Sequence, residues 1–510
     1  MLENFAAGLD LLFSGNTFFF LLGGVVLGFV VGVLPGFSAT NAVAIVLPFS
    51  IGLGLTDALL MMVGIYAGAT FAGAIPAILL NVPGTPGAAA TAIEGHPMAL
   101  KGQANRAIGI ARMASTLGGT LAMCIILPFL PLTTGFALSF GSRELLLVAV
   151  FGLLMITTVI GDDVRKGMIA GLLGLAIAMM GSSPITAAPR ATFGLIELAD
   201  GVPFIPALIG LFAFGEMFLL GARGQTVTSE VRAERDNNWL REAWGGIVAT
   251  LSYPVTIIRS SLIGLGVGMV PGTGTAVGNF ISYGLARRFS RNPELNGKGN
   301  PEGIVASEAA DNAVAAGTLV PTMTLGIPGS GTAAVMLAAM LLHGVTPGPR
   351  VMITHTAEVY ATFLGLLFAT LLILPLGLIL ARPMLLVCRL PAQVLAPGIL
   401  VVGSVGAFAF RNSLFDVGLA MAFGVLGMIL RAYRYPIAPL ILALIIGPIA
   451  EMHLMRSLRL SRGQLSYYFD SPVALVLWAL LAFMIVYAIL LERRRLKAAS
   501  AVATFDGADA

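Results

Sequence analysis

The chain has 510 residues, of which 57% are hydrophobic and only 11% are charged, with a formal net charge of +4. Soluble globular proteins carry about a quarter charged residues, so this composition excludes a soluble protein and indicates a polytopic membrane protein. The basic residues are scattered through short loops, which is typical of membrane topology rather than of nucleic-acid binding. The only cysteines, Cys124 and Cys388, lie in different halves, so we expect neither a disulfide framework nor a metal site.

In chain order, the apolar runs predict an all-α protein with roughly 10–12 transmembrane helices, at about 20 residues per span. The clearest runs cover 17–34, 57–80, 108–130, 144–160, 167–181, 204–220, 357–380, 414–430 and 473–491. A polar segment at 223–243 divides the chain, so we expect a first membrane repeat at 1–222 and a second at 244–491. The basic segment at 492–497 predicts a tail, 492–510, on the cytoplasmic side.

One pattern of proline and glycine occurs twice. Gly-Val-Leu-Pro-Gly at 32–36 and Asn-Val-Pro-Gly-Thr-Pro-Gly at 81–87 return as Gly-Met-Val-Pro-Gly at 268–272 and Gly-Ile-Pro-Gly-Ser-Gly-Thr at 326–332. Such residues interrupt helical hydrogen bonds, and each unsatisfied group costs several kcal/mol in hydrocarbon. Paired broken helices at matching places indicate a transporter whose binding site lies between two repeats.

The distribution of basic residues predicts how the two repeats are oriented. In the first half the basic loop follows the second break (Lys101, Arg106), whereas in the second half it follows the first break (Arg287, Arg288). If basic loops face the cytoplasm, equivalent elements point in opposite directions. We therefore expect an inverted repeat with re-entrant hairpins at 81–87 and 326–332.

These two hairpin loops are the predicted substrate site. Free N–H groups of a Pro-Gly turn, together with the start of the following helix, can bind an anion without a fixed positive charge. The alternative is that they are ordinary turns at the membrane surface. The residues that we expect to bind substrate are Asn81, Pro83, Gly84, Thr85, Gly87, Thr91, Gly326, Pro328, Gly329, Ser330, Gly331 and Thr332.

The first breaks, near Pro35 and Pro271, are the predicted ion-coupling sites. They place main-chain carbonyls beside Ser, Thr and Asn, which are oxygen ligands that suit Na⁺. Alternatively, their glycines only allow the hairpins to approach. The residues that we expect to couple ions are Ser38, Thr40, Asn41, Gly272, Thr273, Thr275, Asn279, Glu308, Asp311 and Asn312.

Carboxylates inside apolar segments need a partner or a role. Glu308 and Asp311 lie one helical turn apart and can bind a cation or a proton, although Glu308 can also be read as a first-turn residue stabilised by the helix dipole. Glu216 has no basic neighbour before Arg223 in the sequence.

Enzyme motifs are missing, since the chain has no HExxH, no GxSxG and no complete P-loop. We therefore expect no enzyme activity and no cofactor beyond a coupling Na⁺ or H⁺.

Taken together, the 32–36 and 81–86 motifs, the segment Gly-His-Pro-Met-Ala at 95–99 and the stretch 306–313 leading to 325–330 resemble the large membrane subunit of the tripartite tricarboxylate transporters, the TctA family. The resemblance covers about 23–348. It implies cation-coupled uptake of citrate or related carboxylates across a bacterial inner membrane. It also implies a small TctB-like membrane subunit and a TctC-like periplasmic solute-binding protein as partners. The alternative function is a stand-alone carrier or channel for small anions.

Overall fold

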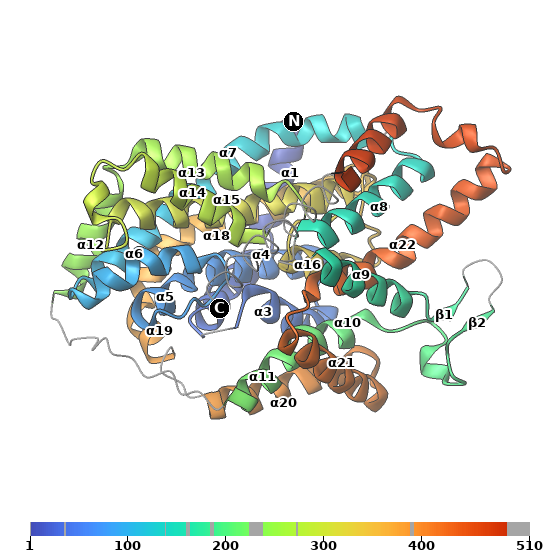
Figure 1. Ribbon diagram of the computed structural model, residues 1–510, viewed down its shortest axis with the longest axis horizontal. Helices are drawn as coiled ribbons and strands as arrows, with labels where there is room; N and C mark the ends of the chain where they lie inside the picture. Colours follow the sequence, from blue (N-terminus) through green and yellow to red (C-terminus); the bar gives the residue numbers. More distant parts are fainter. Residues whose placement is uncertain are drawn as a thin grey trace, which may run out of the picture. The chain divides into compact units, whose positions relative to one another are not determined.

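The computed structural model of the chain describes residues 2–34, 37–137, 139–159, 164–183, 188–223, 238–271, 274–387 and 392–486. These residues are almost entirely helical, and the strands among them are one antiparallel pair, β1 (Gly181–Ser182) and β2 (Pro189–Arg190). The expectation of an all-α polytopic membrane protein is thereby confirmed (Figure 1).

Two series of helices correspond to each other along the chain. The first comprises α1 (Leu2–Phe13), α2 (Thr17–Gly32), α3 (Ala39–Val46), η1 (Leu47–Gly52), α4 (Leu55–Ala72), α5 (Ala74–Leu80), α6 (Ala88–Leu100) and α7 (Ala104–Ala137). The second comprises α12 (Trp239–Thr250), α13 (Pro254–Gly268), α14 (Gly274–Arg288), η4 (Pro293–Leu295), α15 (Pro301–Leu325), α16 (Gly331–Leu342), α17 (Val351–Thr354) and α18 (Thr356–Ile379).

Further helices complete the described chain. They are α8 (Ser142–Val159), α9 (Val164–Ala178), η2 (Ile196–Leu198), α10 (Phe204–Leu208), η3 (Ile209–Phe214), α11 (Gly215–Arg223), α19 (Ala381–Val387), α20 (Ala392–Arg411), α21 (Leu414–Ala432), α22 (Ile437–Ser461), η5 (Leu465–Tyr468) and a last apolar helix, Pro472–Val486.

Among the described residues, seven helices are long and apolar enough to cross a membrane, and up to nine if each bent pair is counted as one span. The sequence predicts more spans because several apolar runs are divided by proline and glycine. The helices Ala39–Gly52 and Gly331–Leu342, for example, are apolar but short.

The chain packs into two compact units. One contains Met1–Leu138 and Pro203–Tyr433, and the other contains Ser139–Val202 and Arg434–Ala510. These units are defined by packing, whereas the repeats at 1–222 and 244–491 are defined by sequence, so the repeat boundaries stay a prediction. The tail at 492–510 lies outside the described residues.

Equivalent helix pairs in the first unit pack through glycines. A Cβ atom added to Gly28 on α2 would lie 2.5 Å from the Ile65 carbonyl oxygen on α4, and one added to Gly264 on α13 would lie 2.4 Å from the Ala310 carbonyl oxygen on α15. These glycines therefore bring the helix backbones into contact, as small residues do in membrane proteins.

The two halves also share the bend before the packed helix pair and a hydrogen bond at the start of that pair. The pair α1 and α2 is bent by 73°, and the pair α12 and α13 by 79°. The Thr17 hydroxyl donates to Asp57 at the start of α4 over 2.7 Å, and the Thr256 hydroxyl donates to Glu302 at the start of α15 over 2.7 Å. The bend and the threonine–carboxylate hydrogen bond thus occur once in each helix series.

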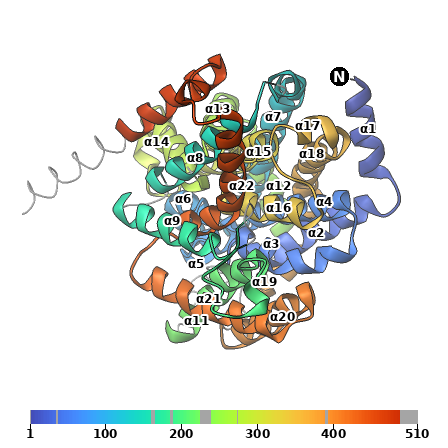
Figure 2. The ribbon, with the colours of Figure 1, turned by 90° about the vertical axis from the view of Figure 1, so that its right-hand side faces the viewer.

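Contacts between loops are those expected if the two helix series run in opposite directions. The Lys101 ammonium, after α6, donates to the Lys298 carbonyl before α15, whereas the His343 ring, after α16, contacts the Ser50 carbonyl before α4. Where α4 and α15 cross, the Tyr66 hydroxyl lies 3.2 Å from the Thr318 hydroxyl. Figure 2 shows α1, α2, α4 and α18 grouped together, in keeping with the contacts of α1 with α18 and of α2 with α4.

In the first unit, Glu216 on α11 pairs with Arg431 on α21 over 3.0 Å. Arg431 also donates to the carbonyl oxygens of Leu211 and Phe212, which lie in the π-helical segment η3. A π-helical turn is rare and displaces carbonyls from the regular helix pattern. Arg431 therefore neutralises Glu216 and satisfies this irregular backbone at once.

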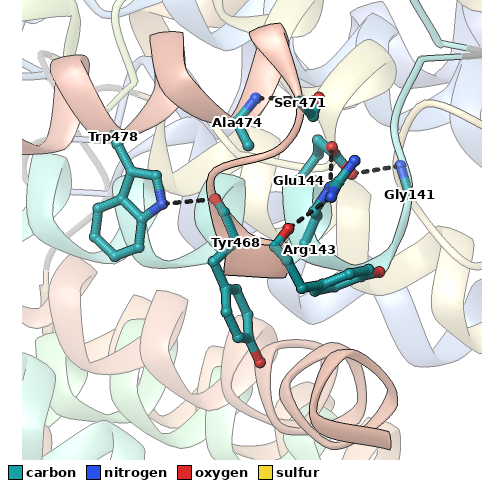
Figure 3. Close-up of polar contacts among 8 residues, drawn as sticks. Gly141, Arg143, Glu144, Tyr468, Ser471, Ala474 and Trp478 are labelled. Carbon is teal, nitrogen blue, oxygen red and sulfur yellow. Dashed lines mark hydrogen bonds and ion pairs between the residues drawn. The ribbon is translucent and has the colours of Figure 1, made fainter. Parts of the chain in front are cut away.

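The second unit is held by its own polar contacts. Figure 3 shows Arg143 and Glu144 at the start of α8, where Glu144 accepts from the Gly141 N–H over 2.9 Å and Arg143 donates to the Tyr467 carbonyl over 2.6 Å. The Trp478 indole donates to the Tyr468 carbonyl over 3.1 Å. The Arg143 bond thus fastens η5 to the start of α8, and the Trp478 bond fastens η5 to the helix that follows it.

In the same unit, Arg190 on β2 forms a two-point ion pair with Glu451 on α22. The hydrogen-bonded Glu451 carboxylate raises the pKa of the Arg190 guanidinium above its ordinary value. The strand pair is thereby attached to the longest helix of this unit.

Candidate functional site

The two predicted hairpin loops begin with the same backbone turn. Helix α5 is capped by Asn81, with φ 55°, and α15 is capped by Gly326, with φ 71°, both in the left-handed region that Gly and Asn tolerate. The N–H of Val82 donates to the Pro76 carbonyl over 3.4 Å, and that of Ile327 donates to the Pro321 carbonyl over 3.2 Å. The repeated proline spacing thus encodes one helix cap used twice.

The central glycine of each loop sits against a helix end. A Cβ at Gly84 would lie 2.3 Å from the Gly32 carbonyl oxygen, where α2 ends. One at Gly329 would lie 3.1 Å from the Gly268 carbonyl oxygen, where α13 ends, and 2.8 Å from the Thr318 Cβ. Both loops are therefore inserted among helix ends, where no side chain fits.

The first hairpin reaches the carboxylates of the second half. A Cβ added to Gly87 would lie 2.3 Å from Asp311 Oδ1 and 2.6 Å from Asn279 Nδ2. One turn along α6, the Thr91 hydroxyl donates to Glu308 Oε1 and also shares a hydrogen bond with Ser307. Thr91, predicted to bind substrate, thus meets Glu308, predicted to couple ions.

Glu308 receives a further hydrogen bond from α7, a helix to which the sequence assigned no site residue. The Ser115 hydroxyl on α7 donates to Glu308 Oε2 over 2.8 Å. Glu308 lies about two turns inside α15, which begins at Pro301. The reading of Glu308 as a first-turn residue held by the helix dipole is therefore wrong.

The second hairpin reaches the first half in the corresponding way. The Ser330 hydroxyl lies 3.1 Å from the Tyr66 hydroxyl on α4, and the Thr332 hydroxyl lies 2.9 Å from the Thr40 hydroxyl on α3. Ser330 also caps α16 by accepting from the Ala333 N–H. Each hairpin of one half thus packs on the first break and the long helix of the other half.

The Asp311 cluster, which we define as Asp311, Asn279 and Thr275, contains buried polar atoms without partners. Asn279 and Thr275 lie beside the Asp311 carboxylate. Both groups lie close enough to interact with the carboxylate. By strict hydrogen-bond geometry, however, neither carboxylate oxygen of Asp311 and neither amide atom of Asn279 has a partner within the described part of the chain, and both residues are fully buried. A buried carboxylate is costly unless it is paired or binds a cation.

This arrangement suits a hard cation, since the carboxylate of Asp311, the amide oxygen of Asn279 and the hydroxyl of Thr275 are all oxygen ligands. No group of three or more His, Cys, Asp or Glu residues able to hold a metal ion occurs among the described residues.

Other predicted residues lie at the edges of this arrangement. Asn41 and Thr85 are buried, and the Thr85 hydroxyl lacks a partner among the described residues. Ser38 precedes α3 without a side-chain cap, and Asn81 is exposed. Gly272 and Thr273 fall outside the described residues. Asn312 faces away from Asp311, toward Gly119 on α7.

Sequence reasoning missed Tyr66, Ser115 and Thr318, which contact the hairpins or Glu308. Tyr66 was detectable as a phenol within a long apolar run. The two hydroxyl residues gave no signal, because Ser and Thr are common in membrane helices.

Comparison with known proteins gives a family match. The model of the family described as "Tripartite tricarboxylate transporter TctA family" matches residues 18–442. A relative from Agrobacterium vitis, "Uncharacterized 52.8 kDa protein in TAR-I ttuC' 3'region", is 32% identical over 490 residues, covering 96% of each chain. A second from the same organism, "Uncharacterized protein in TAR-II ttuC' 3'region", is 33% identical over 223 residues, covering 44% of this chain and 92% of the relative. No solved structure matches.

Proposed function

Because this chain belongs to the tripartite tricarboxylate transporter TctA family, we propose that it forms the translocation path of a cation-coupled importer of organic carboxylates. Its partners are a small TctB-like membrane subunit and a TctC-like periplasmic binding protein that delivers the solute. The importer resides in a bacterial inner membrane with the C-terminus in the cytoplasm. The chain itself catalyses no reaction. The observation that carries this proposal is the exchange of hairpins between the halves, which places two Pro-Gly turns against buried polar clusters.

The hairpin loops bind the solute. Both loops contact the region where α4 and α15 cross, through Ser330 and Tyr66 on one side and Gly87 and Asp311 on the other. At the start of α16, no hydrogen bond among the described residues uses the N–H groups of Gly331 or Thr332. Such N–H groups at a helix start favour a carboxylate.

The Asp311 cluster binds the coupling cation. A cation there neutralises the Asp311 carboxylate before a negatively charged solute approaches the neighbouring loops. Solute binding is therefore favoured by cation binding, and the same coupling free energy acts in the reverse direction.

Transport proceeds by alternating access. The hairpins and the long helices α4 and α15 move as paired elements past the remaining helices, as in other transporters built from inverted repeats. Because each hairpin is fastened to the opposite half, movement of one half displaces the solute contacts of both.

The test is substitution of the central loop glycines, Gly84→Val and Gly329→Val. Each added side chain collides with a helix end at the distances given above, so we expect carboxylate uptake by cells that express the complete three-component system to fall to background. Gly23→Val on α2 and Gly266→Val on α13 are matched controls, because nothing lies within 4 Å of a Cβ at either position.

Membrane insertion is measured in parallel by the amount of folded chain in isolated membranes. Normal uptake by both loop variants at normal expression would refute the site. Uptake by proteoliposomes that contain this chain alone, without the binding protein, would favour the stand-alone carrier instead.

A further inference from the structure

Arg112 is a buried cation that the sites described above do not use. It lies on α7 within the apolar span Ala104–Leu132, and its side chain is only 1% exposed. Its Nε and Nη1 atoms have no hydrogen-bond partner among the described residues, and no ion pair joins it to a carboxylate there. Three of the five N–H donors of the guanidinium group are thus unused.

The immediate surroundings of Arg112 do not neutralise its charge. Its Cζ atom lies 5.8 Å from the centre of the Phe71 ring on α4, and a Cβ added to Gly377 on α18 would lie 2.7 Å from its Nε. The ring attracts a cation weakly through its face, but it accepts none of the N–H groups. The glycine leaves the space that the guanidinium group occupies.

Another arginine of this unit, Arg431, whose side chain is 18% exposed, shows what is absent here. Arg431 is paired with Glu216 and donates to two carbonyl oxygens. Charged groups inside a membrane protein pair in this way, or else mark a path for a solute or ion.

Two threonines lie on the same face of α7 as Arg112. Thr116 and Thr120 follow at intervals of four residues, so all three lie on one face of the helix. Helix threonines elsewhere, such as Thr70, Thr322 and Thr370, donate to the carbonyl four residues earlier. The Thr116 and Thr120 hydroxyls make no hydrogen bond within the described chain.

The same face of α7 packs against α15, the helix that carries Glu308 and Asp311, at Asn312. A Cβ added to Gly119 would lie 3.3 Å from the Asn312 Cβ on α15 and 2.5 Å from the Thr370 side chain on α18. The amide nitrogen of Asn312 also lacks a partner among the described residues. Unused donors of four side chains therefore lie along about two turns of α7, where this helix packs on α15 and α18.

We propose that Arg112, with Thr116, Thr120 and Asn312, forms an anion subsite that binds a carboxylate group of the transported solute. This inference rests on the proposed function, because it assumes that the solute is a carboxylate. The planar guanidinium group binds a carboxylate through two parallel hydrogen bonds. The Thr116 hydroxyl, one turn along α7, supplies a further donor to this carboxylate. Thr120 and Asn312 lie about two turns from Arg112 and supply donors to the rest of the solute.

The test separates a ligand-binding arginine from a structural one. The full chain and its Arg112→Met variant are reconstituted in phosphatidylcholine nanodiscs, and thermal unfolding is followed with and without citrate, succinate or acetate. If Arg112 lacks a partner in the empty protein, Arg112→Met unfolds at the same or a higher temperature, because an unpaired buried charge is replaced by an apolar side chain of similar length. The stabilisation by citrate or succinate is lost in this variant.

Arg106→Met is the matched control, since Arg106 is an exposed basic residue on the same helix. It should keep the full stabilisation. A lower unfolding temperature of empty Arg112→Met with the citrate shift retained would show a structural arginine and overturn the inference. The inference is also overturned if none of the three carboxylates stabilises the unchanged protein. A third contrary result is stabilisation that appears only when the nanodiscs contain phosphatidylglycerol and that is lost in Arg112→Met, because Arg112 would then bind a lipid phosphate.

Uptake by the three-component system distinguishes this inference from the proposed function. We expect Arg112→Met to raise the KM for the solute by about tenfold or more, as the loss of about 1.4 kcal/mol of binding implies. An unchanged KM, with transport still abolished by Gly84→Val and Gly329→Val, would overturn the subsite and leave the proposed function standing. Absence of any carboxylate uptake by the unchanged system would refute the proposed function itself.

Discussion

At the scale of single residues, Asp311 carries most of the argument for ion coupling. Glu308, one turn away, is satisfied by the hydroxyls of Thr91 and Ser115, whereas both oxygens of Asp311 lack a hydrogen bond within the described part of the chain. Two buried carboxylates so close together are unfavourable as two negative charges. A cation at Asp311 removes that repulsion, while Glu308 remains held in place.

This difference predicts the effect of Asp311→Asn. The substitution keeps the shape of the side chain but removes the negative oxygen ligand, so we expect the cation concentration that gives half-maximal uptake to rise by about tenfold or more, corresponding to about 1.4 kcal/mol. Uptake into vesicles is measured as a function of Na⁺ at fixed pH and as a function of pH without Na⁺, which identifies the ion.

Asp57→Asn is the matched control, because Asp57 occupies the position on α4 that Glu302 occupies on α15 and lies outside the Asp311 cluster. An unaltered cation dependence in Asp311→Asn, alongside normal expression, would remove Asp311 from the coupling site.

At the scale of elements, Glu94 fastens a helix of one half to a loop of the other. Its buried carboxylate, on α6, accepts from the Tyr283 hydroxyl on α14 and from the N–H groups of Gly297, Gly299 and Asn300. The loop before α15 therefore takes its shape from a residue that lies about 200 positions earlier in the chain.

Glu94→Ala should loosen this junction. It leaves four donors without an acceptor, of which the Tyr283 hydroxyl and the Asn300 N–H belong to buried residues. Each buried donor left unpaired costs about 1–3 kcal/mol. We expect a lower unfolding temperature and faster hydrogen exchange of the amides at 297–300, measured by mass spectrometry in nanodiscs.

Glu294→Ala, at an exposed acidic residue of the same loop, should leave both quantities unchanged. If the exchange at 297–300 is equally slow in Glu94→Ala, the loop is held by other contacts and Glu94 does not fasten the two halves.

At the scale of the whole molecule, the positions of the basic residues predict that the two helix series run in opposite directions. The Lys101–Lys298 contact joins two basic loops, whereas the His343–Ser50 contact joins two loops that hold few basic residues. Basic loops favour the cytoplasmic side. The first pair of loops is therefore expected inside the cell and the second pair outside.

Single cysteines test this orientation in a chain that carries Cys124→Ser and Cys388→Ser. A thiol reagent that does not cross membranes should label Gly52→Cys and Thr346→Cys in intact spheroplasts. Gln103→Cys and Lys298→Cys should react only after the membrane is opened. All four positions are exposed in the structure.

Equal labelling of Gln103→Cys and Gly52→Cys from outside would contradict opposed repeats. A variant whose transport activity is lost is omitted from this comparison, because its fold is not established.

The sequence alone determined the fold class and the repeated Pro-Gly turns. The physical reason is local. Backbone N–H and C=O groups in hydrocarbon must be hydrogen-bonded, so apolar runs predict helices. The prolines near the helix ends, which are Pro76, Pro83, Pro321 and Pro328, predict the breaks independently of their surroundings. The left-handed caps at Asn81 and Gly326 follow from that local chemistry.

Only the tertiary structure decided which residues meet. The contacts of Thr91 with Glu308, of Ser330 with Tyr66 and of Glu94 with the 297–300 loop join residues 200 or more positions apart. The sequence also did not predict that Arg112 is buried without a carboxylate partner. In the sequence it is one of several basic residues close together in the chain. Such pairings depend on how the two halves exchange hairpins, which no local pattern of residues encodes.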